Sequence, residues 1–523
     1  MQYDAVVIGA GHNGLASAIH LAKAGWKVAV FEKASQPGGA VKTVEATLPG
    51  FRHDLGAMNL SLFAGSAFFR EFEADLLAHG LEFVPAAQTF SSVFPDGRWL
   101  GVDLDIERTV ELIGRFSSAD AKQWRQMVAE FGNDAPHIFA LLGTPMPSWA
   151  LVRVLYKAWR EKGRTWCFDT LRLILSSPRE FLEENFESEQ VKSLMACWGM
   201  HLDFAPDVAG GALFPYLESM ANQSFGMVLG KGGADTIVRA MTSLLESMGG
   251  EIHLATEVTK VKVEANIATG VKLADGRIID AKRAVVANLA PQVLFGRLIP
   301  YTALPEGFSQ HMRSFKYGPG TMMIHLALTE LPEWQASNSL KSFAYVHVAP
   351  FLSDMAQAYN EAIDGLLPGS PVIVVGQPTA IDPGRAPDGK HILWLQVRVL
   401  PAIIKGDAAG AILATDWAGA KEGYADRVVE KLSGYAPNLP GAILRRAVYS
   451  PSDLERENPN LVGGDNLAGS HHLRQNFLFR PALGWSRYRM PIERLYMVGA
   501  STWPGAGTGA GSGQLLGKML SQR

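Results

Sequence analysis

The stretch YDAVVIGAGHNG, residues 3–14, decides the fold of this chain. Its apolar run is typical of a buried parallel strand, and its glycines allow the tight turn that leads from such a strand into a helix. An alanine-rich helix pattern follows, and residues 27–31 read as a second strand that ends at Glu32, eighteen residues after Gly14. This order predicts a dinucleotide-binding unit, with pyrophosphate at the helix N-terminus and Glu32 on a ribose.

The length and charge of the chain limit the classes of protein to which it can belong. With 523 residues, it is expected to form at least two domains. Its net charge is -3 and it has no dominant basic block, so a nucleic-acid partner is not expected. No uninterrupted apolar run is long enough to span a bilayer. The first strand begins at residue 3, which leaves no room for a signal peptide, and cysteines are scarce, so we expect a reduced, cytoplasmic protein.

No metal site is predicted. Cys167 and Cys197 are the only cysteines and lie thirty residues apart, while His471 and His472 are neighbours whose side chains would diverge on a strand.

Glycine-rich loops divide the rest of the chain. Residues 36–39 and 51–57 read as loops that could run against a ligand, and residues 105–220 are mainly helical. A glycine turn at 231–235 leads into a helix expected at 236–248, followed by short strands and a hairpin turn at 274–277. At the C-terminus a strand enters Gly499 and a glycine-rich stretch, which predicts a second phosphate-facing helix start.

Several of these motifs together resemble one family. They are GAGHNGL at 9–15, KGGAD at 231–235, AIDP at 380–383, APDGKH at 386–391 and the glycine-rich C-terminus. The chain resembles phytoene-desaturase-like FAD oxidoreductases, in particular the branch whose animal members are called pyridine nucleotide-disulfide oxidoreductase domain-containing protein 2. The resemblance implies an α/β fold like that of amine oxidases and carotenoid desaturases. It implies a discontinuous Rossmann-type FAD-binding domain (1–100, 225–300 and 445–523) and an interleaved α+β substrate domain (101–224 and 301–444).

The resemblance also implies which residues bind FAD. The glycines of the first turn would line the pyrophosphate, Glu32 the adenosine ribose, Val258 the adenine, and the C-terminal residues the flavin end. The full set is Gly9, Gly11, His12, Asn13, Gly14, Glu32, Lys33, Gly38, Gly39, Ala57, Val258, Gly499, Ala500, Thr508, Gly509 and Ala510. Many flavoproteins of this fold have an acidic residue just after the final strand. This chain has Ala500 and Ser501 there, so backbone amides are expected to replace it.

The resemblance favours FAD that is bound non-covalently, because the thioether link of some relatives needs a C-terminal cysteine and none follows Cys197. Amine oxidases of this fold carry a lysine near flavin N5. The corresponding position here is Met323, which makes amine oxidation less favoured. His325, on the same strand face as Met323, is the candidate catalytic side chain, and Trp503 is a candidate wall of the flavin site. Core packing is the alternative for both.

We therefore expect an FAD-dependent oxidoreductase that desaturates, oxidises or isomerises a lipophilic or cyclic substrate by hydride transfer to flavin N5. Two alternatives are an amine or amino-acid oxidase on the same fold, and a flavin-bearing protein that binds a protein partner with little turnover. The expected partner is an apolar small molecule. The sequence indicates neither the electron acceptor nor the oligomeric state.

Residues 149–166 form an amphipathic, basic helix pattern. The basic residues Arg153, Lys157, Arg160 and Arg164 share one face by their spacing, and aromatic residues lie beside them. Two interpretations are open: peripheral docking on an anionic membrane, or a surface helix whose aromatic side chains fill the core of the substrate domain.

Overall fold

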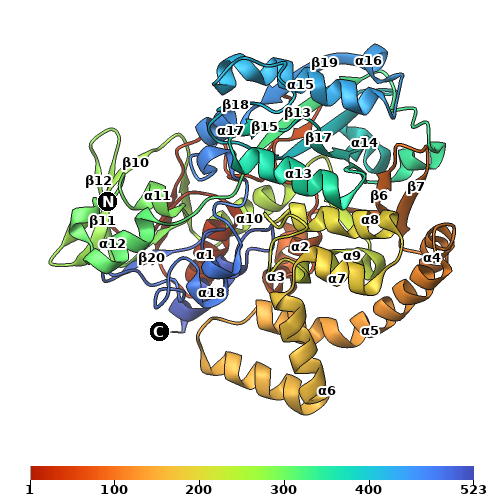
Figure 1. The fold of residues 1–523 in the computed structure, drawn as a ribbon. Coiled ribbons are helices and arrows are strands. Elements are labelled where there is room, and N and C mark those ends of the chain that lie inside the picture. Colours follow the sequence, from red (N-terminus) through yellow and green to blue (C-terminus); the bar gives the residue numbers. More distant parts are fainter. Residues whose placement is uncertain (1, 523) are drawn as a thin grey trace.

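A computed structural model describes residues 2–522 and contains two seven-stranded sheets (Figure 1). In the first sheet, β1 pairs in parallel with β2 and β12, and β12 pairs in parallel with β20. The strand order is β10 (Val258–Glu264), β11 (Ile267–Leu273), β12 (Ile278–Ala287), β1 (Gln2–Ile8), β2 (Val28–Phe31) and β9 (Glu251–His253), with β20 (Leu495–Met497) beside β12. The predicted α/β class is confirmed, and N-terminal, central and C-terminal segments meet in one sheet.

Helices and loops bury both faces of β1, because successive side chains of a strand point to opposite faces. Ala5 and Val7 pack against helices, whereas Val6 and Ile8 lie on the opposite face, in one cluster with side chains of β10 and β11. The helices on the Ala5 face are α1 (His12–Lys23), α3 (Ala67–Ala78), α10 (Thr236–Ser247) and α18 (Gly511–Ser521). The opposite face is covered by α11 (Pro291–Leu294) and α12 (Glu306–Arg313).

The second sheet combines strands that lie far apart in the sequence. Its order is β19 (Ile443–Tyr449), β13 (Gly320–Leu328), β17 (His391–Leu400), β16 (Val372–Gly376), β14 (Tyr345–Val348), β6 (Gln88–Val93) and β7 (Trp99–Asp103). One face packs against α15 (Trp417–Ser433), and the other against α8 (Glu189–Met200), α9 (Leu213–Phe225) and α13 (Leu352–Ile363). The domain junctions predicted at residues 100 and 445 fall inside β7 and β19. A pairing between such distant segments leaves no local sequence signal.

The expected helical region is confirmed, since residues 106–225 carry six helices, and shorter elements complete the fold. The remaining helices are α2 (Ser61–Ala64), α4 (Ile106–Gly114), α5 (Ser118–Leu142), α6 (Trp149–Leu175), α7 (Pro178–Asn185), α14 (Pro378–Ile381), α16 (Leu439–Ala442) and α17 (Pro451–Glu457). Two-stranded sheets join β3 (Thr43–Val44) to β4 (His53–Asp54), β5 (Phe83–Ala86) to β8 (Met227–Gly230), and β15 (Leu366–Leu367) to β18 (Gly406–Asp407).

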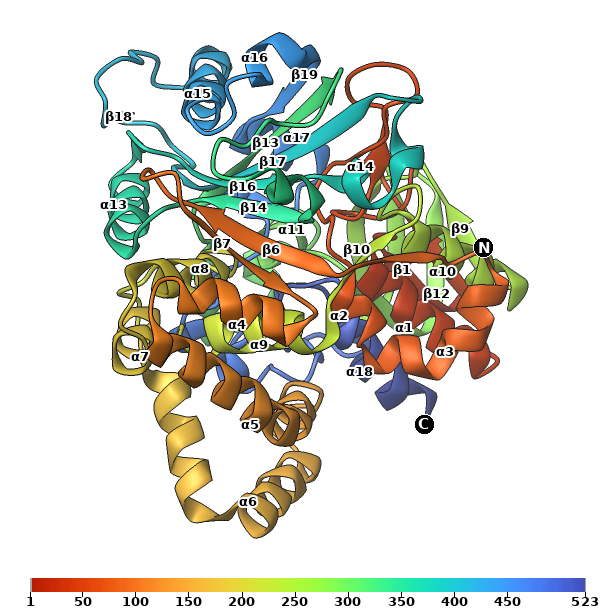
Figure 2. The same ribbon diagram turned by 90° about the vertical axis from the view of Figure 1, so that its right-hand side faces the viewer.

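Helix α6 projects from the body of the molecule (Figure 2). Gly163 interrupts it with a φ of 81°, so the segments on either side run in different directions. Of its residues, all within the described chain, only Ala158 is buried. Trp149 is 80% exposed and Trp159 is 52% exposed, so the interpretation that the aromatic residues fill a core is wrong. Within residues 2–522, no helix is long and apolar enough to cross a membrane.

Candidate functional site

The predicted glycine turn closes around the side chain of Asn288, which directly follows β12. A Cβ on Gly11 would lie 2.8 Å from Asn288 Nδ2, and a Cβ on Gly499 would lie 2.8 Å from Asn288 Oδ1. A Cβ on Gly14 would lie 2.4 Å from the carbonyl oxygen of Gly9. Side chains do not tolerate such distances, so glycine at these positions lets the N-terminal, central and C-terminal loops converge. Sequence reasoning missed Asn288, although short strands were expected in this part of the chain.

Glu32 lies at the rim of this turn. Its Oε2 accepts a hydrogen bond from the backbone N–H of Ala10 (2.8 Å), and its Oε1 accepts one from Ala34 (2.9 Å). These bonds fix a half-buried carboxylate beside the glycines and leave acceptor capacity for a ligand. Its neighbour Lys33 is exposed and forms an ion pair with Glu257 (3.0 Å). The ribose assignment of Glu32 stays a prediction.

The N-termini of α1 and α18 are tied together by side chains. Asn13 Oδ1 accepts from Ser512 Oγ (2.9 Å), and Ser512 Oγ accepts from the backbone N–H of Gly499 (2.8 Å). The N-cap of α1 is Gly11, which supplies no side-chain acceptor, and the first turn of α1 contains no acidic residue. Its free N–H groups and its dipole therefore favour an anion at this point.

The second glycine loop runs alongside the first. Gly38 forms an isolated parallel bridge with Gly11 and has a φ of +125°, which L side chains rarely adopt. A Cβ on Gly39 would lie 3.5 Å from the Cα of Gly11. Ala57, from the next loop, donates its N–H to the carbonyl of Ala40 (3.2 Å). The predicted residues of three loops are thus neighbours in space.

The C-terminal glycine stretch closes over the start of α1. His12 Nε2 lies 3.1 Å from the carbonyl oxygen of Gly507, and burial lowers the pKa of His12 to about 4, so the ring is neutral at pH 7. Thr508 is buried, and its Oγ1 has no hydrogen-bond partner in the described protein. Gly509 and Ala510 lead into α18. A buried hydroxyl without a partner is costly unless a ligand completes it, so Thr508 fits a ligand-facing position.

Val258 begins β10 and lies opposite Leu273. Thr256, two residues before it, donates its N–H to the carbonyl of Glu32 (2.8 Å). The segment that carries Val258 therefore contacts the Glu32 backbone two residues before Val258, and the adenine assignment of Val258 stays a prediction.

Two of the family-like motifs meet at Arg385. Its guanidinium is fully buried and donates to Asp54 (2.5 Å), to Asp382 (3.1 Å) and to the carbonyl of Gly230 (2.5 Å). Asp54 Oδ1 also accepts the N–H of Ala234 (2.7 Å). The KGGAD loop, the AIDP turn and the loop that carries Ala57 are therefore held by one buried ion-pair network. Sequence reasoning noticed the motifs and missed this role, because the pairing joins residues 331 positions apart.

His325 lies on the face of the second sheet that is turned away from α15. In register across the sheet, Tyr345 aligns with Gly376, Gly376 with Trp394, and Trp394 with His325. These side chains share one face because they lie in one row. His325 is fully buried, and neither ring nitrogen has a partner in the described protein. It is therefore not a hydrogen-bonded core histidine, and burial holds its pKa well below the usual value.

The row of Tyr345, Trp394 and His325 lies against the loop that contains Ala57. Trp394 Nε1 donates to the carbonyl of Gly56 (3.1 Å), and the backbone of Asn59 hydrogen-bonds the Tyr345 side chain. Gly56 and Asn59, on either side of the predicted flavin contact Ala57, thus hydrogen-bond side chains on this face of the sheet.

Trp503 is packed rather than open. Its Nε1 donates to the carbonyl of Thr144 (2.8 Å), and its ring centroid lies 5.3 Å from that of Phe477. Ala500, three residues before it, accepts through its carbonyl from the buried guanidinium of Arg480 (2.6 Å). The final strand therefore ends against a buried arginine where related flavoproteins are expected to have an acid.

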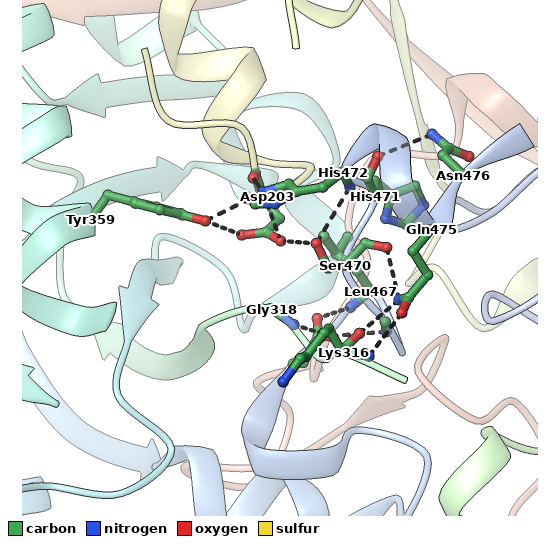
Figure 3. Close-up of polar contacts among 12 residues, drawn as sticks. Asp203, Lys316, Gly318, Tyr359, Leu467, Ser470, His471, His472, Gln475 and Asn476 are labelled. Atoms are coloured by element: carbon green, nitrogen blue, oxygen red, sulfur yellow. Dashed lines mark hydrogen bonds and ion pairs between the residues drawn. The ribbon is translucent and has the colours of Figure 1, made fainter. Parts of the chain in front are cut away.

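His471 and His472 diverge as expected, although they lie in a loop and not on a strand (Figure 3). His471 Nε2 accepts from the N–H of Ala506 (2.9 Å), whereas His472 Nε2 lies 2.8 Å from the carbonyl oxygen of Asp203. Asp203 in turn accepts from Tyr359 (3.0 Å) and from Ser470 Oγ. Within residues 2–522, no group of three or more His, Cys, Asp and Glu could hold a metal ion.

Comparisons with known proteins agree with this geometry. The model of the flavin containing amine oxidoreductase family matches residues 14–510. Pyridine nucleotide-disulfide oxidoreductase domain-containing protein 2 of Mus musculus is 28% identical over 98% of this chain and 92% of its own. A limonene dehydrogenase component of Castellaniella defragrans is 28% identical over 100% and 95%. A neurosporene-forming phytoene desaturase of Cereibacter sphaeroides is 24% identical over 98% and 94%.

Solved structures share the fold. An oxidoreductase from Methanosarcina mazei has a TM-score of 0.62, 18% identity and full coverage of both chains. A putrescine oxidase variant has a TM-score of 0.62, with 15% identity over 100% of this chain and 98% of its own. The resemblance to phytoene-desaturase-like enzymes is confirmed. The chain therefore belongs to the flavin containing amine oxidoreductase family and is a flavin-dependent oxidoreductase.

Proposed function

We propose that the flavin is FAD, held non-covalently across the glycine turns. The support comes from the cradle that a Cβ would fill at Gly11 and Gly14, the α1 N-terminus without an acidic residue, and the carboxylate of Glu32 at its rim. The buried hydroxyl of Thr508, which has no partner among the described residues, would meet the other end of the cofactor. No cysteine follows Cys197, so a thioether link from the C-terminal segment is not available.

We propose further that the enzyme oxidises, desaturates or isomerises a lipophilic or cyclic substrate. When bound, FAD supplies hydride acceptance at flavin N5. The protein's part is to hold a C–H bond of the substrate against the flavin and to exclude water. The observation that carries this proposal is the buried face of Tyr345, Trp394 and His325 beside the loop of Ala57.

His325 would act as a neutral side chain on this face. Burial keeps its pKa well below the usual value, so it does not carry a proton near pH 7. Neither ring nitrogen has a partner among residues 2–522, so it could donate one hydrogen bond and accept another. The strand offers Met323 and His325 but no lysine, which favours C–H over amine oxidation.

Anaerobic titration of the yellow protein tests this proposal. Either a polyene or a cyclic ketone is expected to bleach the flavin band, and amines are not. Bleaching by amines alone would indicate that the protein is an amine oxidase. Bleaching by none of them would favour a flavin-bearing protein that acts by binding a partner.

The proposal extends to substrate access. We propose that α6 docks on an anionic membrane surface and brings the substrate domain to an apolar substrate. Its aromatic residues Trp149, Tyr156 and Trp159 are exposed beside basic side chains, which suits the lipid headgroup region.

A further inference from the structure

A group of aromatic and histidine rings lies on the same sheet face as His325, on the side of α8 and α9. Trp198 of α8 lies with its ring centroid 4.8 Å from that of His201 and 5.7 Å from that of His347. His201 and His347 are 5.6 Å apart, and Tyr345 lies in the same group. We call Trp198, His201, Tyr345 and His347 the ring cluster.

Four nitrogen atoms of the ring cluster have no hydrogen-bond partner in the described protein. They are Trp198 Nε1, His201 Nε2, and Nδ1 and Nε2 of His347, all of them buried. Groups of this kind cost free energy when they are left unpaired, and native proteins pair nearly all of them. Four buried nitrogen atoms in one place without a partner in the described protein point to a ligand that binds there.

The other buried tryptophans provide an internal comparison. Six tryptophan side chains are buried in residues 2–522, and five of them donate their indole N–H to a protein acceptor. The five are Trp124, Trp334, Trp394, Trp417 and Trp503. Trp198 alone does not. Outside the ring cluster, each buried indole N–H in the described chain therefore has a protein acceptor, and the one exception lies in the ring cluster.

An acidic side chain faces the same group. Glu218 of α9 makes no hydrogen bond or ion pair through its carboxyl group within the described residues, and it interacts electrostatically with Tyr345. Burial raises the pKa of Glu218 to about 7, so a large share of these carboxyl groups is neutral near pH 7 and can donate.

The ring cluster lies beside the predicted flavin loop. Tyr345 meets the backbone of Asn59, and His347 follows two residues later on the same face of β14. A ligand that touches the ring cluster would therefore extend toward Ala57.

We propose that the ring cluster and Glu218 bind a carbonyl or hydroxyl oxygen of an otherwise apolar, alicyclic substrate. This inference rests on the proposed function and names its substrate class. The indole N–H of Trp198 and a neutral Glu218 both donate, so the ligand must offer an acceptor, and neutral histidines can serve an oxygen that donates or accepts. A pure hydrocarbon would leave these groups buried and unpaired.

An ammonium substrate is disfavoured here. Arg398 is buried and donates its guanidinium to the carbonyl of Met200 (2.8 Å), next to His201 in the chain. Its positive charge lowers the pKa of His201 further, after burial, and would repel a cationic ligand. The charge of Arg398 instead attracts the partial negative charge on the oxygen of a ketone or alcohol.

Matched ligand pairs test the proposal on the FAD-loaded protein. The pairs are cyclohexane with cyclohexanone, limonene with carvone, and decalin with 2-decalone, followed by the shift of the flavin absorption band and by tryptophan fluorescence. In at least one pair the ketone is expected to bind about tenfold tighter than its hydrocarbon or more. Trp198→Phe and His347→Leu should remove that preference. Trp26→Phe, packed against the core around α1 in the first sheet's domain, is the matched control and should keep it.

Thermal unfolding separates ligand recognition from a structural role. If the orphans face a ligand, His347→Leu should not lower Tm in the absence of ligand, because it replaces unpaired polar atoms by an apolar group. Equal binding within every pair, no binding of any compound, or variants that melt lower with unchanged preference would each overturn the proposal; in the last case ordered water completes the cluster. Loss of FAD loading in the wild-type protein would instead count against the proposed function.

Discussion

Arg385 donates to Asp54 over 2.5 Å, and both side chains are buried out of contact with solvent. The pair links the short β3–β4 sheet, which precedes Ala57, to the turn that follows α14 in the substrate-domain segment. Asp382 and the carbonyl of Gly230 complete the guanidinium's partners. A buried charge is tolerated only with such full pairing.

Arg385→Met should therefore destabilise the protein by about 3–5 kcal/mol, because it leaves the Asp54 carboxylate buried without its cation. The free energy of unfolding from urea titration measures this. Arg277→Met removes an ion pair with Asp275 in which both side chains are about half exposed, and should change stability by less than about 0.5 kcal/mol. Equal effects of the two variants would contradict the role of Arg385.

Glu32→Ala should weaken FAD binding by about 1–3 kcal/mol, the scale of a charge-assisted hydrogen bond lost at a site removed from water. The flavin content after extensive dialysis, with the Kd from titration of the apoprotein, measures the loss. Glu246→Ala, on the exposed side of α10, is the control and should retain the flavin. A Glu32→Ala protein with unchanged flavin content would contradict the assignment of Glu32 to the adenosine ribose.

Acid precipitation should release the yellow colour into the supernatant. Non-covalent binding depends on folded loops around Gly11 and Thr508, which acid unfolding separates. The absorbance of supernatant and pellet checks this, with a thioether-linked flavoprotein as reference. Colour that stays on the pellet would indicate a covalent bond and contradict non-covalent binding, with a histidyl link as the first to test.

The sequence predicted those parts of the site that are local in the chain. The strand β1, the turn from Gly9 to Gly14 and the carboxylate of Glu32 lie within thirty-two residues and follow a known spacing. The helix expected at 236–248 is α10, which ends one residue earlier. The helix start expected at the C-terminal glycine-rich stretch is that of α18, which begins at Gly511 after the left-handed Ala510.

Contacts between distant segments could not be predicted. Asn288 among the glycines, Arg385 on Asp54 and the row from Tyr345 to His325 each depend on strand pairings that bring together residues far apart in the chain. Period two did predict that Met323 and His325 share a face. It could not indicate that Trp394 stands beside them.

Acid should destabilise the protein through its buried histidines. Burial lowers the pKa of His347 to about 3, whereas an unfolded histidine has a pKa of about 6.5. Below pH 6.5 the unfolded chain takes up this proton and the folded chain does not. The free energy of unfolding therefore decreases as the pH is lowered, by up to about 1.4 kcal/mol per pH unit. Urea unfolding between pH 4.5 and 7 measures the slope.

His347→Phe should flatten that slope by about one proton relative to the wild-type protein. Glu218, with its pKa raised to about 7, contributes the opposite slope between about pH 4.5 and 7, so the comparison is the difference between variant and wild type. His311→Phe, at an exposed position, is the control and should leave the slope unchanged. An unchanged slope in His347→Phe would mean that this ring is protonated in the folded protein.

Helix α6 provides the last prediction, and the break at Gly163 changes its geometry. Arg153, Lys157 and Arg160 lie on the continuous helix before the break, whereas Arg164 follows it and leaves their common face. The prediction of one four-residue basic face is wrong in this respect. The exposed aromatic side chains before the break, Trp149, Tyr156 and Trp159, remain next to the three basic residues.

Flotation with vesicles that contain anionic phospholipid should carry the protein upward at low salt, and the floated fraction should fall as salt rises, because the attraction is screened. Replacing Arg153, Lys157 and Arg160 by glutamate should abolish flotation, while Arg164→Glu alone should reduce it only in part. Sedimentation without vesicles controls for self-association through the same aromatic side chains. Wild-type protein that stays at the bottom of the gradient at low salt would mean that α6 does not bind lipid, and the exposed tryptophans would then need a protein partner to cover them.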